Sequence, residues 1–179
     1  MKSNIYSINK MTSKHTVMDS LIQHSEEYKN NKSAKRISVV SIRMVKEHSI
    51  LYRERKISSP SDAAKIARNF LLESDREQLI VICLDTKNQP TAINVVSVGT
   101  LSSSLVHPRE VFKPAILSNS ASIILSHNHP SGDCTPSSED ISVTTRIKES
   151  GKILGIELLD HIIIGDMDRY VSVKEKGVL

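Results

Sequence analysis

Two histidines separated by one residue, His127 and His129, stand just after the apolar run 121–125 and are followed at once by Pro130. A short apolar run of this kind predicts a buried strand, and a proline ends it. Side chains alternate along an extended backbone, so both imidazoles lie on the same side of it and can face one metal ion. The chain is therefore expected to contain a sheet with a metal site at the end of one strand.

Asp140 is the expected third ligand. It follows His129 beyond a turn rich in Gly, Pro and Ser, which gives the chain enough slack to bring a carboxylate oxygen back to the ion. Two histidines and one aspartate leave a fourth tetrahedral position for water, the arrangement of a catalytic zinc rather than a structural one. In a purely structural interpretation, Ser137 caps a helix and Asp140 complements its dipole. That interpretation explains Ser137 and Asp140 but not both histidines.

The order His127-Xaa-His129-Pro130, six residues, then Ser137-Xaa-Xaa-Asp140 resembles the JAMM motif of the MPN metalloprotease superfamily. The sequence His-Asn-His-Pro-Ser-Gly-Asp at 127–133, together with residues 99–101, 108–112 and 160–165, is similar to the RadC branch of that superfamily. The resemblance covers about residues 57 to 179. Members of the wider superfamily hydrolyse peptide or isopeptide bonds with one zinc ion, so the resemblance implies a zinc cofactor and a peptide or protein substrate. The RadC branch carries a DNA-repair label, and the motif does not specify its substrate.

Hydrolysis near neutral pH also needs a group that takes a proton from water and passes it to the leaving amine. In the JAMM pattern this group is a glutamate upstream of the histidines, and Glu77, directly before the apolar run 79–84, matches best. Glu110 is the alternative, although its place at a predicted helix start is explained by the favourable interaction of a carboxylate with the helix dipole alone. By resemblance, Ser137 would donate a hydrogen bond to the oxyanion that forms as water attacks the carbonyl.

Two further groups near the motif have a possible link to the metal. Asp160-His161 opens an apolar strand, where the imidazole can give a metal-bound histidine a supporting hydrogen bond or be an ordinary buried histidine. Cys134 lies in the loop between the ligands, and thiolate is a strong zinc donor. We expect Cys134 at most as an additional ligand.

The periodic patterns predict an α/β (α+β) domain with a mixed sheet flanked by helices in three layers, as the MPN fold would supply by resemblance. The predicted helices are 62–73, with Ser61 or Asp62 as cap, 108–117 and 137–151. The predicted strands are 78–85, 91–99, 122–127, 158–165 and 169–173.

The segment before residue 57 is expected to be an appendage. Residues 1–36 are polar and predict a flexible segment, whereas 37–45 and 49–52 are rich in β-branched residues and predict a strand or hairpin extension over 37–56. The MPN (JAMM) domain is expected over 57–179.

The composition permits several partners but indicates none. The net charge of +4 would allow contact with nucleic acid, yet acidic residues are interspersed and there is no Trp, so the aromatic platforms of single-strand binders are not evident. The absence of a membrane-length apolar run and of a signal-like start, with two cysteines in dissimilar settings, leads us to expect a cytoplasmic protein that does not contact membrane.

Three functional hypotheses follow. The first is a zinc metallopeptidase of the JAMM class with His127, His129 and Asp140 as ligands, Glu77 as general base and Ser137 as oxyanion helper. The second is a DNA-repair-associated or nucleic-acid-associated accessory protein of the RadC type without peptidase activity. The third is a scaffold with an intact but silent motif.

Overall fold

The computed structural model describes residues 37–53, 55–72, 74–99 and 106–179. The predicted flexible segment 1–36 lies outside these residues. The helices and strands below all belong to one unit, residues 43–179. They are α2 Pro60–Leu71, β1 Gln78–Leu84, β2 Pro90–Val98, α3 Pro108–Leu117, β3 Ser122–Asn128, α4 Ser138–Leu154, β4 Glu157–Ile164 and β5 Tyr170–Ser172.

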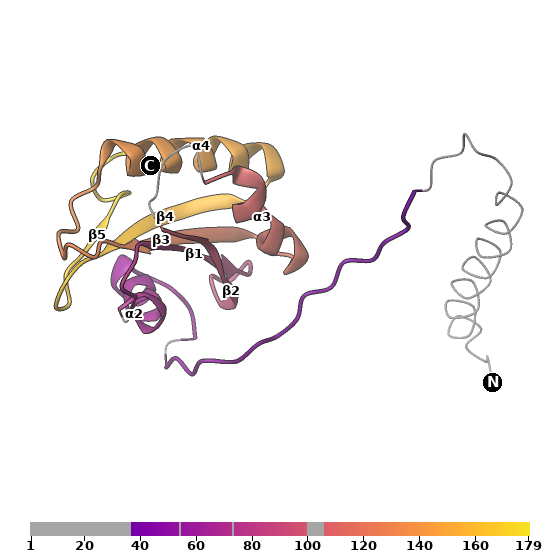
Figure 1. Ribbon diagram of the computed structural model, residues 1–179, viewed down its shortest axis with the longest axis horizontal. Helices are drawn as coiled ribbons and strands as arrows, with labels where there is room; N and C mark the ends of the chain where they lie inside the picture. Colours follow the sequence, from indigo (N-terminus) through magenta and orange to yellow (C-terminus); the bar gives the residue numbers. More distant parts are fainter. Residues whose placement is uncertain (1–36, 54, 73, 100–105) are drawn as a thin grey trace, which may run out of the picture. The chain divides into compact units, whose positions relative to one another are not determined.

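The five strands form one mixed sheet in the order β2-β1-β3-β4-β5 (Figure 1). Neighbouring strands are antiparallel except β3 and β4, which are parallel. The parallel pair follows from the chain path, since α4 crosses over between them and a parallel neighbour needs such a crossover. β3 therefore lies in the middle of the sheet, with its last residues, His127 and Asn128, between β1 and β4.

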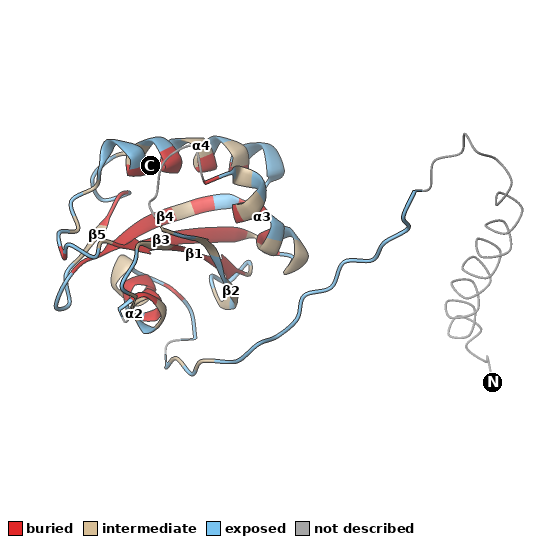
Figure 2. Cartoon of the chain, viewed as in Figure 1, coloured by how far each residue is buried: buried red, intermediate tan, exposed pale blue. Residues whose placement is uncertain are grey.

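Helices cover both faces of this sheet, as the α/β prediction requires (Figures 1 and 2). Successive side chains of β1 point to opposite faces and enter two different cores. On one face, Leu79 and Val81 belong to a cluster with Phe112 of α3 and Ile147 of α4. On the other, Ile80, Ile82 and Leu84 belong to a cluster with Ala63, Ala67 and Leu71 of α2. The predicted three-layer fold is confirmed.

Both α2 and α4 begin with a capping box. Ser137 caps α4 as predicted, with Asp140 as its partner three residues on. The predicted cap of α2 was wrong, because Ser59 is the N-cap and Asp62 the partner inside the first turn. The predicted end of α4 was also too early. The helix passes through the buried Gly151 and stops at Gly155, whose φ of 70° suits glycine.

The predicted strand or hairpin over 37–56 does not form within the described residues 37–53 and 55–56. Ile37, Val39 and Val40 are exposed rather than built into a sheet. β-branched residues favour a strand only when a neighbouring strand supplies hydrogen bonds and packing. Further along, Ile50 and Tyr52 pack without a strand against the cluster that includes α2.

In the part of the chain that the structure describes, no helix has both the length and the apolar character needed to cross a membrane.

Candidate metal centre

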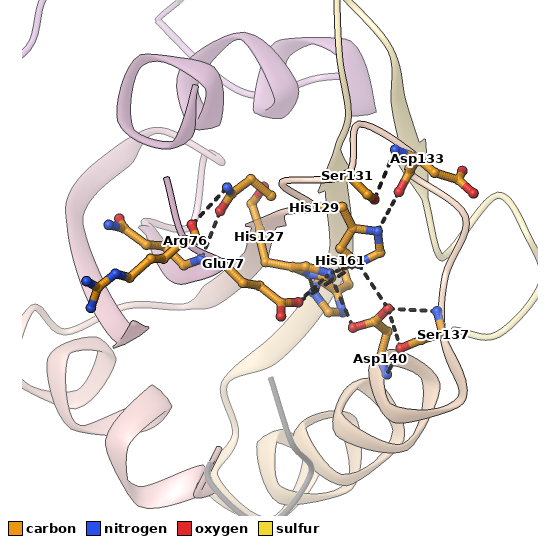
Figure 3. A network of polar contacts seen from close by, with 12 residues as sticks. Arg76, Glu77, His127, His129, Ser131, Asp133, Ser137, Asp140 and His161 are labelled. Atoms are coloured by element: carbon orange, nitrogen blue, oxygen red, sulfur yellow. Dashed lines mark hydrogen bonds and ion pairs between the residues drawn. The ribbon is translucent and has the colours of Figure 1, made fainter. Parts of the chain in front are cut away.

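Four side chains with metal-binding atoms converge at the end of β3. They are Glu77, His127, His129 and Asp140, and their candidate ligand atoms all lie within 4.8 Å of one another. Figure 3 shows them pointing toward a common point: Glu77 directly precedes β1, His127 and His129 lie at and just after the end of β3, and Asp140 is in the first turn of α4. Sequence reasoning selected these four residues, and the fold brings them together.

The distances among three of them fit a tetrahedral ion. Ligand atoms about 2.0 to 2.1 Å from such an ion lie about 3.3 Å from one another. The Nε2 atoms of His127 and His129 are 2.9 Å apart, and Asp140 places one oxygen 3.2 Å from the first and the other 3.5 Å from the second. Glu77 Oε1 is 3.9 Å from both nitrogens, so it lies slightly outside this triangle.

The other ring nitrogen of each histidine has a hydrogen-bond partner inside the protein. Nδ1 of His129 is 2.6 Å from the backbone oxygen of Asp133, which can only accept, so this nitrogen carries the proton. Nδ1 of His127 is 2.8 Å from Nε2 of His161 on β4. Nothing in the sequence indicated the role of the Asp133 carbonyl, because backbone contacts carry no signature in residue type.

His161 is fully buried beside the centre, and its Nδ1 lies 2.6 Å from the hydroxyl oxygen of Thr144 on α4. Burial, and to a lesser degree the neighbouring His127, lowers the pKa of His161 well below the usual 6.5, so this ring is neutral. The prediction that His161 supports a candidate ligand is confirmed in its geometry. Thr144 was missed, although its place one helical turn after Asp140 puts both on the same face.

The carboxylate of Asp140 is held by the helix that it begins. Its Oδ2 accepts hydrogen bonds of 2.7 Å from both the backbone N–H and the hydroxyl of Ser137. Burial alone would raise the pKa of this carboxyl, but the imidazoles of His127 and His129 outweigh burial and hold it far below the usual 3.8. Asp140 is therefore ionised, as a metal ligand must be.

Glu77 is held through its backbone by two strands. The backbone pairing of β1 with β3 ends at Leu79 and His127. Beyond this pair, the side chain of Asn128 makes the hydrogen bonds to the segment around Glu77. The side-chain oxygen of Asn128 accepts a 2.8 Å hydrogen bond from the backbone N–H of Gln78, and its side-chain nitrogen donates a 3.0 Å hydrogen bond to the backbone oxygen of Arg76. On the opposite side, the backbone N–H of Gly99 donates a 2.8 Å hydrogen bond to the backbone oxygen of Glu77. These contacts fix the residue at the mouth of the centre.

The remaining sequence candidates lie elsewhere. Glu110 is on α3, where its carboxylate is 2.6 Å from the amine of Lys113 and 3.4 Å from Arg109, and it is not part of the four-residue group. Cys134 is free and partly buried but is also not part of the group, so it is not an additional ligand in this structure.

A small open hollow of about 100 Å³ borders the centre on the α2 side. It is lined by Leu71, Leu72, Ser74, Asn128, His129, Pro130, Ile164, Gly165 and Asp166. Of the four residues of the centre, His129 belongs to this lining, so a small molecule in the hollow can contact that ring.

Residues 57–178 match the family described as the RadC-like JAB domain, which covers most of the chain and all four residues of the centre. The chain belongs to the RadC-like JAB domain family. Its expected membership of the RadC branch of the MPN/JAMM superfamily is thus confirmed.

Relatives of this RadC-like chain include a UPF0758 protein of Desulfitobacterium hafniense, 58% identical over 123 residues. UPF0758 proteins of Clostridium perfringens and Methanosarcina mazei are each 56% identical over 124 residues. In all three cases the aligned part covers 69% of this chain and 54% of the relative. The RadC-like chain therefore spans about half the length of the curated relatives it matches.

Proposed function

We propose that this protein is a zinc-dependent hydrolase that cleaves an amide bond in a peptide or protein. The observation that carries the proposal is the arrangement of three candidate ligands at tetrahedral spacing, with a fourth carboxylate, Glu77, 3.9 Å from both imidazole nitrogens. The RadC-like JAB domain belongs to a superfamily that includes zinc peptidases, which supports the same reaction class.

Two imidazoles and one carboxylate form a donor set that suits zinc. His127, His129 and Asp140 would hold the ion. When bound, the ion supplies a Lewis acid that polarises the scissile carbonyl and makes water a better nucleophile at neutral pH. Three protein ligands rather than four are typical of a catalytic zinc site, where the fourth position is left for water or substrate.

Glu77 would act as the general base and acid. Its carboxylate is about one-fifth exposed, so water can reach it, whereas its backbone is fixed by Asn128 and Gly99. A carboxylate next to the ligands but outside their triangle takes a proton from the attacking water and returns it to the leaving amine.

Ser137 would stabilise the oxyanion in this proposal. In the structure its hydroxyl donates to Asp140 Oδ2 and accepts from the N–H of Asp140, so the group is committed to capping. To donate a hydrogen bond to an oxyanion, the Ser137 hydroxyl would have to rotate so that its proton points away from Asp140 and toward the substrate. Such a donor is worth about 3 kcal/mol of transition-state stabilisation where one has been removed.

The first test is metal content. Elemental analysis of protein purified without chelator is expected to give about one zinc ion per chain, because tetrahedral sites of this type bind one ion. A double variant, His127→Ala with His129→Ala, is expected to lose it. Folded wild-type protein without zinc would contradict the proposal and give preference to the nucleic-acid-associated alternative.

The second test is cleavage of a peptide library, followed by mass spectrometry of the new termini. Glu77→Gln is expected to abolish cleavage while zinc stays bound. Glu110→Gln is the matched control, since it removes the same charge from an ion-paired position outside the centre. Cleavage that survives in Glu77→Gln but not in Glu110→Gln would assign the base to Glu110.

A further inference from the structure

His127 differs from His129 in how its outer nitrogen is bonded. The Asp133 carbonyl accepts from His129 and leaves only one place for the proton of that ring. The partner of His127 is another imidazole, His161, whose nitrogens can each donate or accept. The state of His127 therefore depends on what holds His161, and the next link is Thr144.

The donor and acceptor roles in this series of hydrogen bonds are determined by its last member, Thr144. The Thr144 hydroxyl oxygen lies 2.6 Å from the backbone oxygen of Asp140, one turn earlier in α4. Two oxygens this close need a proton between them, and only the hydroxyl can supply it, because a carbonyl only accepts. Thr144 thus donates to Asp140 and presents a lone pair to the His161 ring, 2.6 Å away.

Each remaining bond then has one possible direction. Nδ1 of His161 must donate to Thr144, and a neutral imidazole has only this one N–H, so its Nε2 accepts from the ring of His127. Nδ1 of His127 must therefore carry the proton that it shares with His161 over 2.8 Å. In its neutral form, the ring of His127 then keeps the lone pair of Nε2 for an ion at the centre, where Nε2 of His129 and Oδ1 of Asp140 lie 2.9 Å and 3.2 Å away.

We propose that His161 and Thr144 are positioning residues that set the proton of His127 on Nδ1 and so prepare its Nε2 to bind a metal ion. The bonds run from His127 to His161, from His161 to Thr144, and from Thr144 to the backbone of Asp140. Two candidate ligands on different elements, β3 and α4, are thereby joined by one buried hydrogen-bond chain. The inference rests on the metal site of the proposed function but not on hydrolysis.

The hydrogen bonds of His161 and Thr144 are shielded from solvent. His161, Thr144 and Asp140 are all at most 2% exposed, so water does not compete for these bonds. Thr145, the next residue of α4, makes the same kind of bond to the helix, with its hydroxyl 2.9 Å from the oxygen of Ile141. Thr145 is exposed and provides a matched control for the loss of a threonine hydroxyl from the helix.

The test measures the dissociation constant for zinc ions by competition with a chelator. Thr144→Val keeps the shape of the side chain and removes the hydroxyl, and we expect zinc to bind about 10-fold to 100-fold more weakly, the range for lost supporting contacts to a ligand. Thr144→Ser restores the hydroxyl and is expected to rescue binding, and Thr145→Val is expected to bind as wild type does. Equal zinc affinity in Thr144→Val and Thr145→Val would overturn the inference.

A second measurement needs neither zinc nor substrate. In zinc-free wild-type protein labelled with ¹⁵N in its histidine rings, long-range proton–nitrogen correlation spectra report which ring nitrogen carries the proton. We expect the proton of His161 on Nδ1, and a His161 protonated on Nε2 would overturn the inference. Because this spectrum is recorded without zinc, its outcome is distinguishable from a failure of the proposed function, in which the wild-type chain binds no zinc.

Discussion

The side-chain oxygen of Asn128 accepts a 2.8 Å hydrogen bond from the backbone N–H of Gln78. The nitrogen of the same amide donates to the oxygen of Arg76, so one side chain holds the backbone on both sides of Glu77. Asn128 stands between the two candidate histidine ligands in the sequence. The strand that presents the metal ligands therefore also positions the proposed general base.

Replacing Asn128 tests this arrangement. Asn128→Ala leaves the Gln78 N–H and the Arg76 carbonyl without their partner, which we expect to lower the free energy of unfolding by about 1 to 3 kcal/mol. Because Glu77 is no longer fixed, cleavage is expected to slow by up to about 100-fold with zinc still bound. Asn94→Ala, on the exposed part of β2, is the control for both. Urea unfolding and single-turnover rates measure the two effects, and an unchanged rate in a destabilised Asn128→Ala would show that Asn128 acts on the fold alone.

The two capping boxes allow the roles of Ser137 to be separated. Ser59 caps α2 as Ser137 caps α4, but its capping partner Asp62 is not one of the four residues of the centre, whereas Asp140 is. Ser59→Ala and Ser137→Ala are each expected to cost about 1 kcal/mol of unfolding free energy in zinc-free protein. Ser137→Ala should in addition weaken zinc binding, because Asp140 Oδ2 loses the hydroxyl that orients it. Calorimetry with zinc measures this difference, and equal zinc affinity in the two variants would limit Ser137 to capping.

The fold was largely predictable because residues that begin and end helices and strands can be recognised in the sequence. Pro108 starts α3 at its first residue, and the predicted end at Leu117 is also correct. Pro130 and the Ser137–Asp140 pair similarly marked the end of β3 and the start of α4. The extension over 37–56 was misjudged, since residue types report β-propensity but not whether a neighbouring strand exists.

The centre was predictable in its four side chains but not in what supports them. Spacing along one chain segment placed His127, His129 and Asp140 in a common motif, and resemblance selected Glu77. Asn128 and the Asp133 carbonyl act through backbone hydrogen bonds between segments, which depend on the register of β1 and β3 and on the path of the loop. Thr144 acts through His161 on another strand, so its role needs the packing of α4 on β4.

His129 provides a prediction about pH. The hydrogen bond with Asp140 raises its pKa above the usual 6.5, although burial opposes the shift. A raised pKa contributes stability that is fully present below pH 6.5 and lost as the pH rises through the folded value. In zinc-free protein, the stability difference between wild type and His129→Gln should therefore shrink from pH 6 to pH 8. Urea unfolding at both values measures it, and a difference that stays flat or grows would contradict the raised pKa.

The same proton must leave His129 when zinc binds, since a ligand nitrogen needs a free lone pair. The apparent affinity for zinc is thus expected to rise with pH over the range in which the zinc-free protein loses stability. Titrations with zinc at pH 6, 7 and 8 against a chelator corrected for its own protonation measure this. Affinity that is independent of pH would mean that zinc does not replace a proton on this ring.

The loop between the ligands depends on close contact with the end of β4. A Cβ added at Gly165 would lie 2.6 Å from the backbone oxygen of Gly132, so Gly165→Ala must displace the loop that joins His129 to Asp140. Overpacking of this kind costs about 1 to 3 kcal/mol of unfolding free energy, and we expect weaker zinc binding with it. Gly155→Ala is the matched control, because the added Cβ there meets nothing within 4 Å and the cost comes from a φ of 70° at the end of α4. Both variants should be less stable in urea, but only Gly165→Ala should bind zinc more weakly. A loop that is free to shift without affecting the ligands would instead leave zinc affinity unchanged in both.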